Sequence, residues 1–244
     1  MDLSRICVSL DGTHHLLDDV PLYSNRYNWV LKYRPPGLAA AGNESGSFHI
    51  DLKGVPAYEN RFLRTFGFYY GLAAVATREG WGHINPSGEL AYKERYAWTG
   101  NFQDRLCTVR NKDGFYFHIH LHGEPAYPER YRYAGDYRNG IAVIRCNDGY
   151  AIHIDKKGKS INDHRFLDLD VFHKGYARAR DFQGWFHVDK TGNPAYEERF
   201  KLVEPFYNGF ARAIEFSGRI GIIDETGNWI HTIQEPNDTE FMSK

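Results

Sequence analysis

The sequence predicts an all-β protein of tandem repeats, because three separate markers recur along it with one period of about 35 residues. The first marker is a segment that ends in a turn glycine, as in SFHIDLKG, WGHINPSG and WFHVDKTG. The second is a PAYxERF-type segment. The third is a short apolar run, such as GLAAV, that precedes each glycine turn. The arginine of the second marker recurs every 34 or 35 residues, at Arg26, Arg61, Arg95, Arg130, Arg165 and Arg199.

Each repeat is predicted to begin as a β-hairpin. Residues 71–75 (GLAAV) alternate in the manner of a short strand, and a polar turn that ends in Gly80 follows them. Residues 81–85 (WGHIN) form a second strand, and a further turn ends at Gly88. Two strands joined by a glycine turn are typical of a hairpin. The later PAYxERF stretch, with aromatic pieces such as YRYAGDY, is expected to add one or two weaker strands.

The two ends of the chain suggest how the repeats are arranged. The N-terminal segment ICVSLDG, ending at Gly12, supplies half a unit, whereas the C-terminus supplies a complete unit through Ile230. We therefore expect six and a half units in an open twisted array, with the half unit as a cap. A closed ring of six units, like a β-propeller, is the alternative. We expect one domain over residues 1–233 and a mobile tail over residues 234–244.

Composition narrows the classes of partner. The 244 residues carry 30 basic and 31 acidic side chains, a net charge of -1, so no long-range field draws the chain to nucleic acid or to an anionic membrane. We expect neither partner. The first residues, MDLSRICVSL, lack an apolar signal-peptide core, so we expect a cytoplasmic protein. The cysteines Cys7, Cys107 and Cys146 stand far apart without a CxxC pair and are expected to be reduced thiols.

The repeat unit resembles a known family. Its pattern of G-L-A-x-V, a polar turn, W-G-x-I-D, x-x-G and Y-x-x-R-F is similar to the bacterial WG (KWG) β-repeat, from about Ile6 to Ile230. The dipeptide itself occurs once, as Trp81-Gly82. The resemblance implies an all-β scaffold, usually without catalytic residues of its own, found alone or beside other domains that include methyltransferases. The chain has no glycine-rich methyltransferase motif, so such an enzyme would be a separate chain.

A histidine recurs at one position of the repeat. Cys7 and Ile222 take the same place in the terminal units. A row of imidazoles suits metal or phosphate, yet metal ligands must converge on one point, whereas repeat-related side chains are spread along the array. We therefore expect structural histidines that tie neighbouring strands together. They are His49, His83, His118, His153 and His187.

One segment offers a possible metal site. In FHIHLHGE the strand period of two predicts His118, His120 and His122 on one face, with Glu124 just beyond the turn. This arrangement would support a divalent metal and a metal-dependent or small-molecule-binding activity. The repeat already explains His118, however, and no second His or Asp cluster completes a coordination shell. No other cofactor is expected.

The repeated arginines have two interpretations. Arg61, Arg95 and Arg130 form part of a row in register that would grip carboxylates or phosphates of a ligand, nucleic acid included. Alternatively, each arginine packs under an aromatic ring and pairs with the acid of the HID strand. Those acids are Asp51, Asp155, Asp189 and Asp224.

Aromatic side chains are the other candidates for a partner surface. Trp29 and Trp98 follow the repeated arginine by three residues in two units. Tyr, Trp and Arg are enriched at binding hot spots, but the same residues also pack one repeat on the next. The tyrosines of the PAYxERF segments that we assign to the partner surface are Tyr58, Tyr92, Tyr127 and Tyr196.

The sequence thus favours a non-enzymatic scaffold that binds a protein or peptide through its Tyr-, Trp- and Arg-rich positions. No nucleophile elbow, phosphate loop or HExxH motif is present, which favours the absence of catalysis without deciding it. The competing interpretation is the metal-dependent or small-molecule activity at the HxHxH segment.

Overall fold

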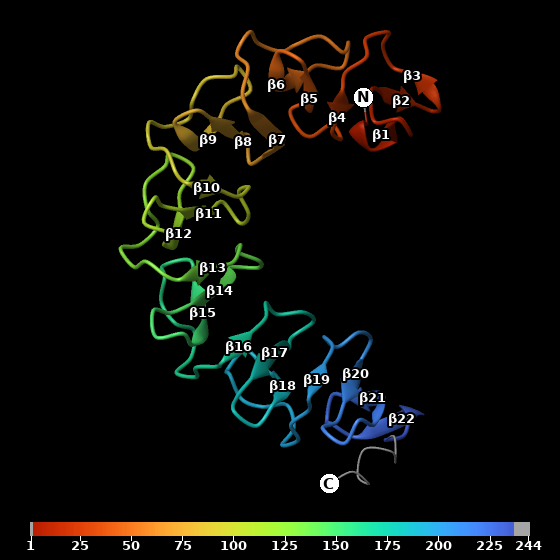
Figure 1. The fold of residues 1–244 in the computed structure, drawn as a ribbon, viewed down its shortest axis with the longest axis vertical. Coiled ribbons are helices and arrows are strands. Elements are labelled where there is room, and N and C mark those ends of the chain that lie inside the picture. Colours follow the sequence, from red (N-terminus) through yellow and green to blue (C-terminus); the bar gives the residue numbers. More distant parts are fainter. Residues whose placement is uncertain (1, 237–244) are drawn as a thin grey trace, which may run out of the picture. The chain divides into compact units, whose positions relative to one another are not determined.

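The computed structural model describes residues 2–236, and within them the regular structure is β-strand apart from the short 3-10 helix η1 (Leu3–Arg5) (Figure 1). The strands form seven small antiparallel sheets in chain order. The all-β tandem-repeat prediction is confirmed. Nowhere in this part of the chain is there a helix with the length and apolar character needed to cross a bilayer.

The chain forms two compact units, residues 1–130 and residues 131–244, where the sequence predicted one domain over residues 1–233. The first unit holds four sheets. They are β1 (Ile6–Val8), β2 (His15–Leu17) and β3 (Val20–Pro21); β4 (Trp29–Val30), β5 (Ala39–Asn43) and β6 (Gly46–Ile50); β7 (Arg64–Tyr69), β8 (Leu72–Thr77) and β9 (Gly80–Ile84); and β10 (Trp98–Thr99), β11 (Cys107–Arg110) and β12 (Tyr116–Ile119).

The second unit holds three sheets. They are β13 (Tyr133–Ala134), β14 (Ile141–Arg145) and β15 (Ala151–Asp155); β16 (Asp168–Leu169), β17 (Ala177–Arg180) and β18 (Trp185–Val188); and β19 (Leu202–Val203), β20 (Phe210–Ile214), β21 (Ile220–Asp224) and β22 (Trp229–Gln234). Strand β22 ends one residue beyond the predicted domain. Of the predicted tail, residues 237–244 lie outside the described residues.

Most repeats form a three-stranded meander with a loop that returns to the last strand, whereas the last sheet, β19 to β22, has four strands. In the third sheet β8 pairs with both β7 and β9, and Ala73 lies opposite Ile84. The PAYxERF-type loop then bridges back to β9, with Trp81 opposite Tyr96. The weaker strands predicted for this stretch are therefore single bridges and the two-residue strands that open the next sheet.

The N-terminal half unit has a different register from the one that the sequence markers predict. The markers align Gly12 with Gly54, which leaves one interval of 42 residues among intervals of 34 and 35. In the structure Gly12 lies in the turn between β1 and β2, and it corresponds to Gly46 at the start of β6, where the turn from β5 ends. Cys7 lies on β1 opposite Leu16, so its assignment to the histidine position is wrong.

Each unit has its own apolar core, built from the faces that the short strands turn inward. In the first unit, Phe48, Ile50 and Ile84 are fully buried beside small alanines of β5 and β8. In the second, Phe200 and Phe206 lie in one cluster with strands β17 to β21. Small residues on the middle strand leave room for these aromatic rings.

Candidate functional site

The recurring histidine joins three parts of the fold. The imidazole Nδ1 of His49 lies 2.5 Å from the hydroxyl of Tyr58, and its Nε2 lies 2.8 Å from the carbonyl oxygen of Phe66 in the next sheet. His187 does the same with Tyr196 and Glu204, at 2.6 and 2.9 Å. A carbonyl only accepts, so Nε2 carries the proton and the tyrosine hydroxyl donates to Nδ1. We call this arrangement the histidine clamp.

The clamp extends to the N-terminal half unit, where sequence comparison missed it. His15 contacts the Tyr23 hydroxyl at 2.6 Å and the Leu31 carbonyl at 2.8 Å. The signal was present, since His15 follows Gly12 by three residues as His49 follows Gly46. The structural interpretation of the histidine row is therefore correct, and the row has no ring free to act as a metal ligand in these three units.

Aromatic stacking and burial keep the clamps neutral. His187 stacks on Phe206 of the next sheet with ring centroids 3.8 Å apart, and His49 lies 4.4 Å from Phe68. Burial lowers the pKa of His49, His83, His153 and His187 to about 4. The same cause raises the pKa of Tyr58 above its ordinary value, so its hydroxyl keeps the proton that it donates.

The predicted surface tyrosines lie inside the fold. Tyr92, Tyr127 and Tyr196 are buried, and Tyr58 is half-buried. The ring of Tyr58 packs on the turn of the next repeat, where a Cβ at Gly88 would lie 2.5 Å from it. Gly88 also has a positive φ of 80°, so glycine meets both needs. Their assignment to a partner surface is wrong, because the clamp and this packing use both the hydroxyl and the ring face.

The repeated arginines brace the loop that precedes them. Nη1 of Arg95 donates to the carbonyls of Tyr92, Lys93 and Glu94 at 2.7 to 3.0 Å. The same three contacts recur in other units, from Arg61 to the loop after Tyr58 and from Arg130 to the loop after Tyr127.

The prediction that these arginines pack against aromatic rings is correct. The guanidinium carbon of Arg130 lies 3.7 Å from the centroid of the Phe117 ring, and that of Arg61 lies 4.1 Å from Phe48. The prediction that they pair with the acid of the HID strand is wrong. Asp51 Oδ1 accepts instead from the backbone amides of Lys53 and Val55, because a short Asp side chain caps its own turn.

The three histidines of the HxHxH segment do not converge. Strand β12 ends at Ile119, so the strand period that would align His118, His120 and His122 is lost after the first of them. His118 is buried with its Nδ1 on the Tyr127 hydroxyl, whereas His120 and His122 are exposed in the following turn. Within residues 2–236 no three His, Cys, Asp or Glu side chains are placed to hold a metal ion. The predicted metal geometry is therefore wrong.

The two tryptophans assigned to the partner surface differ in exposure. Trp98 is 37% exposed at the start of β10, with its ring 6.4 Å from that of Tyr116. Trp29 is half-buried against β5, where a Cβ at Gly42 would lie 2.3 Å from its indole nitrogen. Their role in binding stays a prediction.

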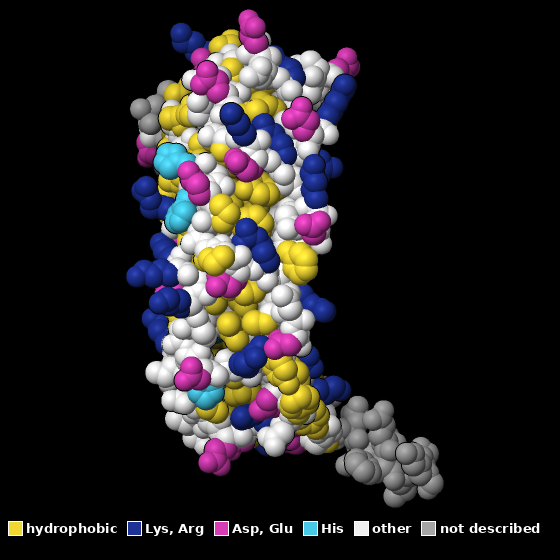
Figure 2. Space-filling view, turned by 90° about the vertical axis from the view of Figure 1, so that its left-hand side faces the viewer, with side chains coloured by type: hydrophobic (Ala, Val, Ile, Leu, Met, Phe, Trp, Pro, Cys, Tyr) yellow, Lys and Arg dark blue, Asp and Glu magenta, His cyan; other side chains and the backbone are white. Residues whose placement is uncertain are grey.

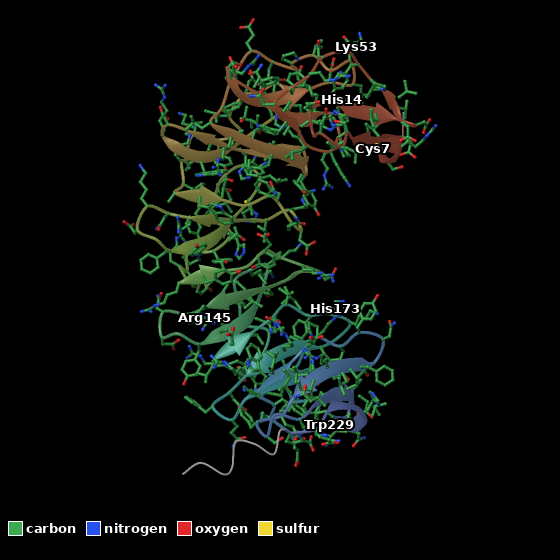
Figure 3. The ribbon with its side chains drawn as sticks, turned by 45° about the vertical axis from the view of Figure 1, so that its right-hand side comes forward. Cys7, His14, Lys53, Arg145, His173 and Trp229 are labelled. Carbon is green, nitrogen blue, oxygen red and sulfur yellow. The ribbon has the colours of Figure 1, made fainter. Side chains whose placement is uncertain are left out.

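A recess of the second unit lies at the turns that follow β13, β16 and β19. These turns lie on one side of that unit (Figure 1), and Figure 3 places His173 on the side away from Arg145. The recess has a volume of about 550 Å³, which is in the range of ligand sites. We call it the second-unit groove. It is lined by Tyr133, Gly135, Arg138, Val143, Leu169, Asp170, Val171, His173, Glu204, Pro205, Phe206 and Tyr207.

The second-unit groove has an apolar floor and aromatic walls. Val143, Leu169 and Phe206 are buried beneath it. Tyr207 is 68% exposed, and its ring lies parallel to that of His173 with centroids 6.4 Å apart. Nδ1 of His173 lies 2.9 Å from the Phe206 carbonyl, so Nδ1 carries a proton and Nε2 is left for a ligand.

Ion pairs neutralise the two carboxylates of the second-unit groove. Asp170 lies 2.5 Å from Nε of Arg178, and Glu204 lies 3.3 Å from Arg212. Lys174 lies over the Tyr207 ring, with Nζ 4.6 Å from its centroid, and donates to Asn208. By contrast, the face shown in Figure 2 mixes basic, acidic and hydrophobic side chains without a patch of one sign.

Sequence reasoning missed this groove, although a signal existed. The residue that opens the turn after the first strand changes chemistry from unit to unit while the rest of the repeat keeps its pattern. A variable position on a constant scaffold is where binding residues are expected. In chain order these residues are Arg34, Tyr69, Gln103, Arg138, His173 and Tyr207.

Several solved structures resemble this chain over most of its length. BamB from Moraxella catarrhalis aligns over 97% of this chain and 87% of its own at 13% identity and a TM-score of 0.50. A eukaryotic initiation factor aligns over 88% of this chain and 68% of its own at 11% identity and a TM-score of 0.51. The computationally designed protein Ika8 aligns over 93% and 82% at 14% identity and a TM-score of 0.49.

No family model and no curated protein matches the chain. At identities this low the structural likeness describes the fold alone. The chain is thus a tandem β-repeat protein with a propeller-like fold, and its candidate site is the second-unit groove.

Proposed function

We propose that this protein is a non-enzymatic repeat scaffold that binds a protein or peptide partner, and that the second-unit groove is its main binding site. The observation that carries the proposal is the contrast between the two sets of aromatic residues. The repeated tyrosines are used internally by the clamps, whereas Tyr207 is 68% exposed beside an apolar recess of about 550 Å³. Exposed aromatic rings at a recess are typical hot-spot residues.

We also propose that the repeats are of the bacterial WG type. The support comes from the pattern of apolar strand, glycine turn and Y-x-x-R-F, with Trp81-Gly82 as the one full match to the dipeptide. In this view the scaffold acts beside other proteins, and Trp98 extends the contact surface in the first unit.

Affinity capture from extract of the native cell tests the proposal. The wild-type chain, Tyr207→Ala and Trp98→Ala are compared, with far-UV circular dichroism to confirm that each variant is folded. We expect the wild type to capture a stoichiometric protein partner and Tyr207→Ala to lose most of it. Loss in both variants would extend the surface to Trp98.

The same preparation, purified without a histidine tag, is analysed for metal. Equal capture by all three proteins would contradict the assignment of the groove. One metal ion per chain without a partner would contradict the scaffold proposal itself and return attention to metal-dependent chemistry.

A further inference from the structure

We infer that the partner presents an acidic peptide segment that carries one large apolar side chain, and that the second-unit groove receives this segment. The inference rests on the proposed binding function and adds the chemistry of the ligand. Three features of the groove argue for it: the state of its charges, its floor and its comparison with the equivalent positions of the first unit.

The charges at the groove favour an anion. Its lining carboxylates, Asp170 and Glu204, already have arginine partners in Arg178 and Arg212. The guanidinium of Arg138 has no hydrogen-bond or ion-pair partner anywhere in residues 2–236. Lys174 has no carboxylate partner in the same part of the chain. Two uncompensated cations beside neutralised acids leave the rim positive, which is complementary to a carboxylate-bearing ligand.

Hydrogen-bonding groups at the rim suit the same ligand. With Nδ1 of His173 engaged by the Phe206 carbonyl, Nε2 is the ring atom left to meet a ligand. This nitrogen can accept a hydrogen bond from a peptide amide of the ligand. Arg138 offers a planar fork that matches a carboxylate in two parallel hydrogen bonds.

The apolar floor of the groove indicates that the ligand also carries an apolar group. Val143, Leu169 and Phe206 are buried below the recess, and Tyr133 and Tyr207 stand exposed at its walls. A ligand with carboxylates alone would leave this apolar surface wet. An aromatic or long aliphatic side chain between acidic residues covers it and removes apolar area from water.

In the first unit the residue equivalent to Arg138 contacts another side chain of the protein. There Arg34 lies over the Tyr69 ring at 4.9 Å and donates to its hydroxyl at 3.1 Å. Arg138 takes the place of Arg34 one unit before His173, without such a partner. Its guanidinium is therefore available to a ligand.

Fluorescence anisotropy with the full chain tests the inference. The probe is a fluorescein-labelled peptide EEEFEEE, compared with EEEAEEE and KKKFKKK. We expect EEEFEEE to bind more tightly than either of the others. Because surface charge pairs are screened by salt, its affinity should fall steeply between low and high sodium chloride.

Charge-reversal variants locate the probe. Arg138→Glu and Lys174→Glu are each expected to weaken EEEFEEE binding about tenfold, because reversal replaces an attraction with a repulsion. The matched control is Lys53→Glu, which makes the same change on an exposed lysine of the first unit (Figure 3). It should change affinity less than about twofold, because Lys53 does not line the groove and exposed charges are screened by salt.

The outcomes separate this inference from the proposed function. Tighter binding of KKKFKKK, or equal binding of EEEFEEE by Arg138→Glu and wild type, would overturn the acidic ligand. If Tyr207→Ala still lost the captured partner, the scaffold proposal would survive that result. A small organic acid without a phenyl group could also displace the probe. If it bound as tightly as EEEFEEE, the inference would be overturned, because no peptide would then be needed.

Discussion

Equivalent positions of the two units form grooves of different size and content. The first-unit groove, lined by residues such as Arg34, Phe66 and Tyr69, has a volume of about 240 Å³, against about 550 Å³ for the second-unit groove. Both lie at turns that follow the opening strand of a sheet, at equivalent positions of the repeat. The difference teaches that the scaffold is set by the repeat, whereas its recesses are set by a few variable side chains.

The physical reason is visible at one position. Gly67 in the first unit lets the stem of Arg34 lie close, since a Cβ there would be 3.1 Å from Arg34 Cγ. Val171 and Pro205 take that position in the second unit. Arg34 thus closes its groove on Tyr69, and the second-unit groove keeps its apolar floor open.

The largest expected effect is a loss of folding stability in acid. It should affect both units, because both contain histidine clamps. Three clamp histidines, His49, His83 and His187, have a pKa of about 4 when folded, against 6.5 as the ordinary value. The unfolded chain binds more protons between these values, so the free energy of unfolding falls as pH drops from about 6.5 to about 4, by roughly 3 kcal/mol per clamp. Above pH 7 the clamps should make the free energy of unfolding independent of pH.

Urea denaturation at several pH values measures this effect. His49→Gln should flatten the slope, because one clamp no longer gains a proton on unfolding. His122→Gln, on an exposed residue, should not. A stability that is constant from pH 7 to pH 4 would contradict the neutral clamp.

The next effect concerns the packing of one repeat on the next. Gly54→Ala places a Cβ 2.3 Å from the Tyr23 ring at a φ of 69°, whereas Gly12→Ala has a φ of 71° and no atom within 4 Å. Gly12→Ala should cost about 1 kcal/mol for its backbone alone. Gly54→Ala should cost roughly 3 kcal/mol or more, because the overpacked ring must also move.

Thermal and urea unfolding of the two glycine variants provide the comparison. Since the backbone strain is nearly equal, any excess in Gly54→Ala measures the ring contact. Equal destabilisation would show that Tyr23 yields without cost.

A smaller effect should follow from loss of one clamp hydroxyl in either unit. Tyr58→Phe and Tyr196→Phe each leave a buried imidazole nitrogen without its donor, which should cost about 1 to 3 kcal/mol. The two values should agree, because the contacts are the same in both units. Urea denaturation of both variants decides this. A cost in only one of them would mean that the clamps are not equivalent.

The smallest effect should come from opening the first-unit groove. Arg34→Ala removes an exposed guanidinium over Tyr69, and such contacts are worth about 0.5 to 1 kcal/mol. The affinity for EEEFEEE should stay unchanged, because the peptide uses the second-unit groove. Urea denaturation and the anisotropy assay measure the two quantities. A change in peptide affinity as large as that of Arg138→Glu would place the ligand in the first unit instead.

Prediction succeeded where the repeat itself carried the information, and failed where the relevant neighbour belonged to another repeat. The structural role of His49 and His187 was predicted from their regular spacing. Tyr92 and Tyr196 were assigned to the surface, because no pattern within one unit shows that their rings cover the glycine turn of the next. The metal geometry failed because β12 ends at Ile119, an end that alternating histidines do not reveal.

By itself the sequence determined the period, the hairpins, the all-β class and the residues that recur, because turn glycines and alternating apolar residues act over a few positions of the chain. Tertiary structure alone decided the register of the N-terminal half unit and the contacts that join one repeat to the next. It also decided which variable turn residues line a recess. The reason is that these contacts join residues far apart in the chain, 17 positions for His49 with Phe66 and 35 for Arg34 with Tyr69.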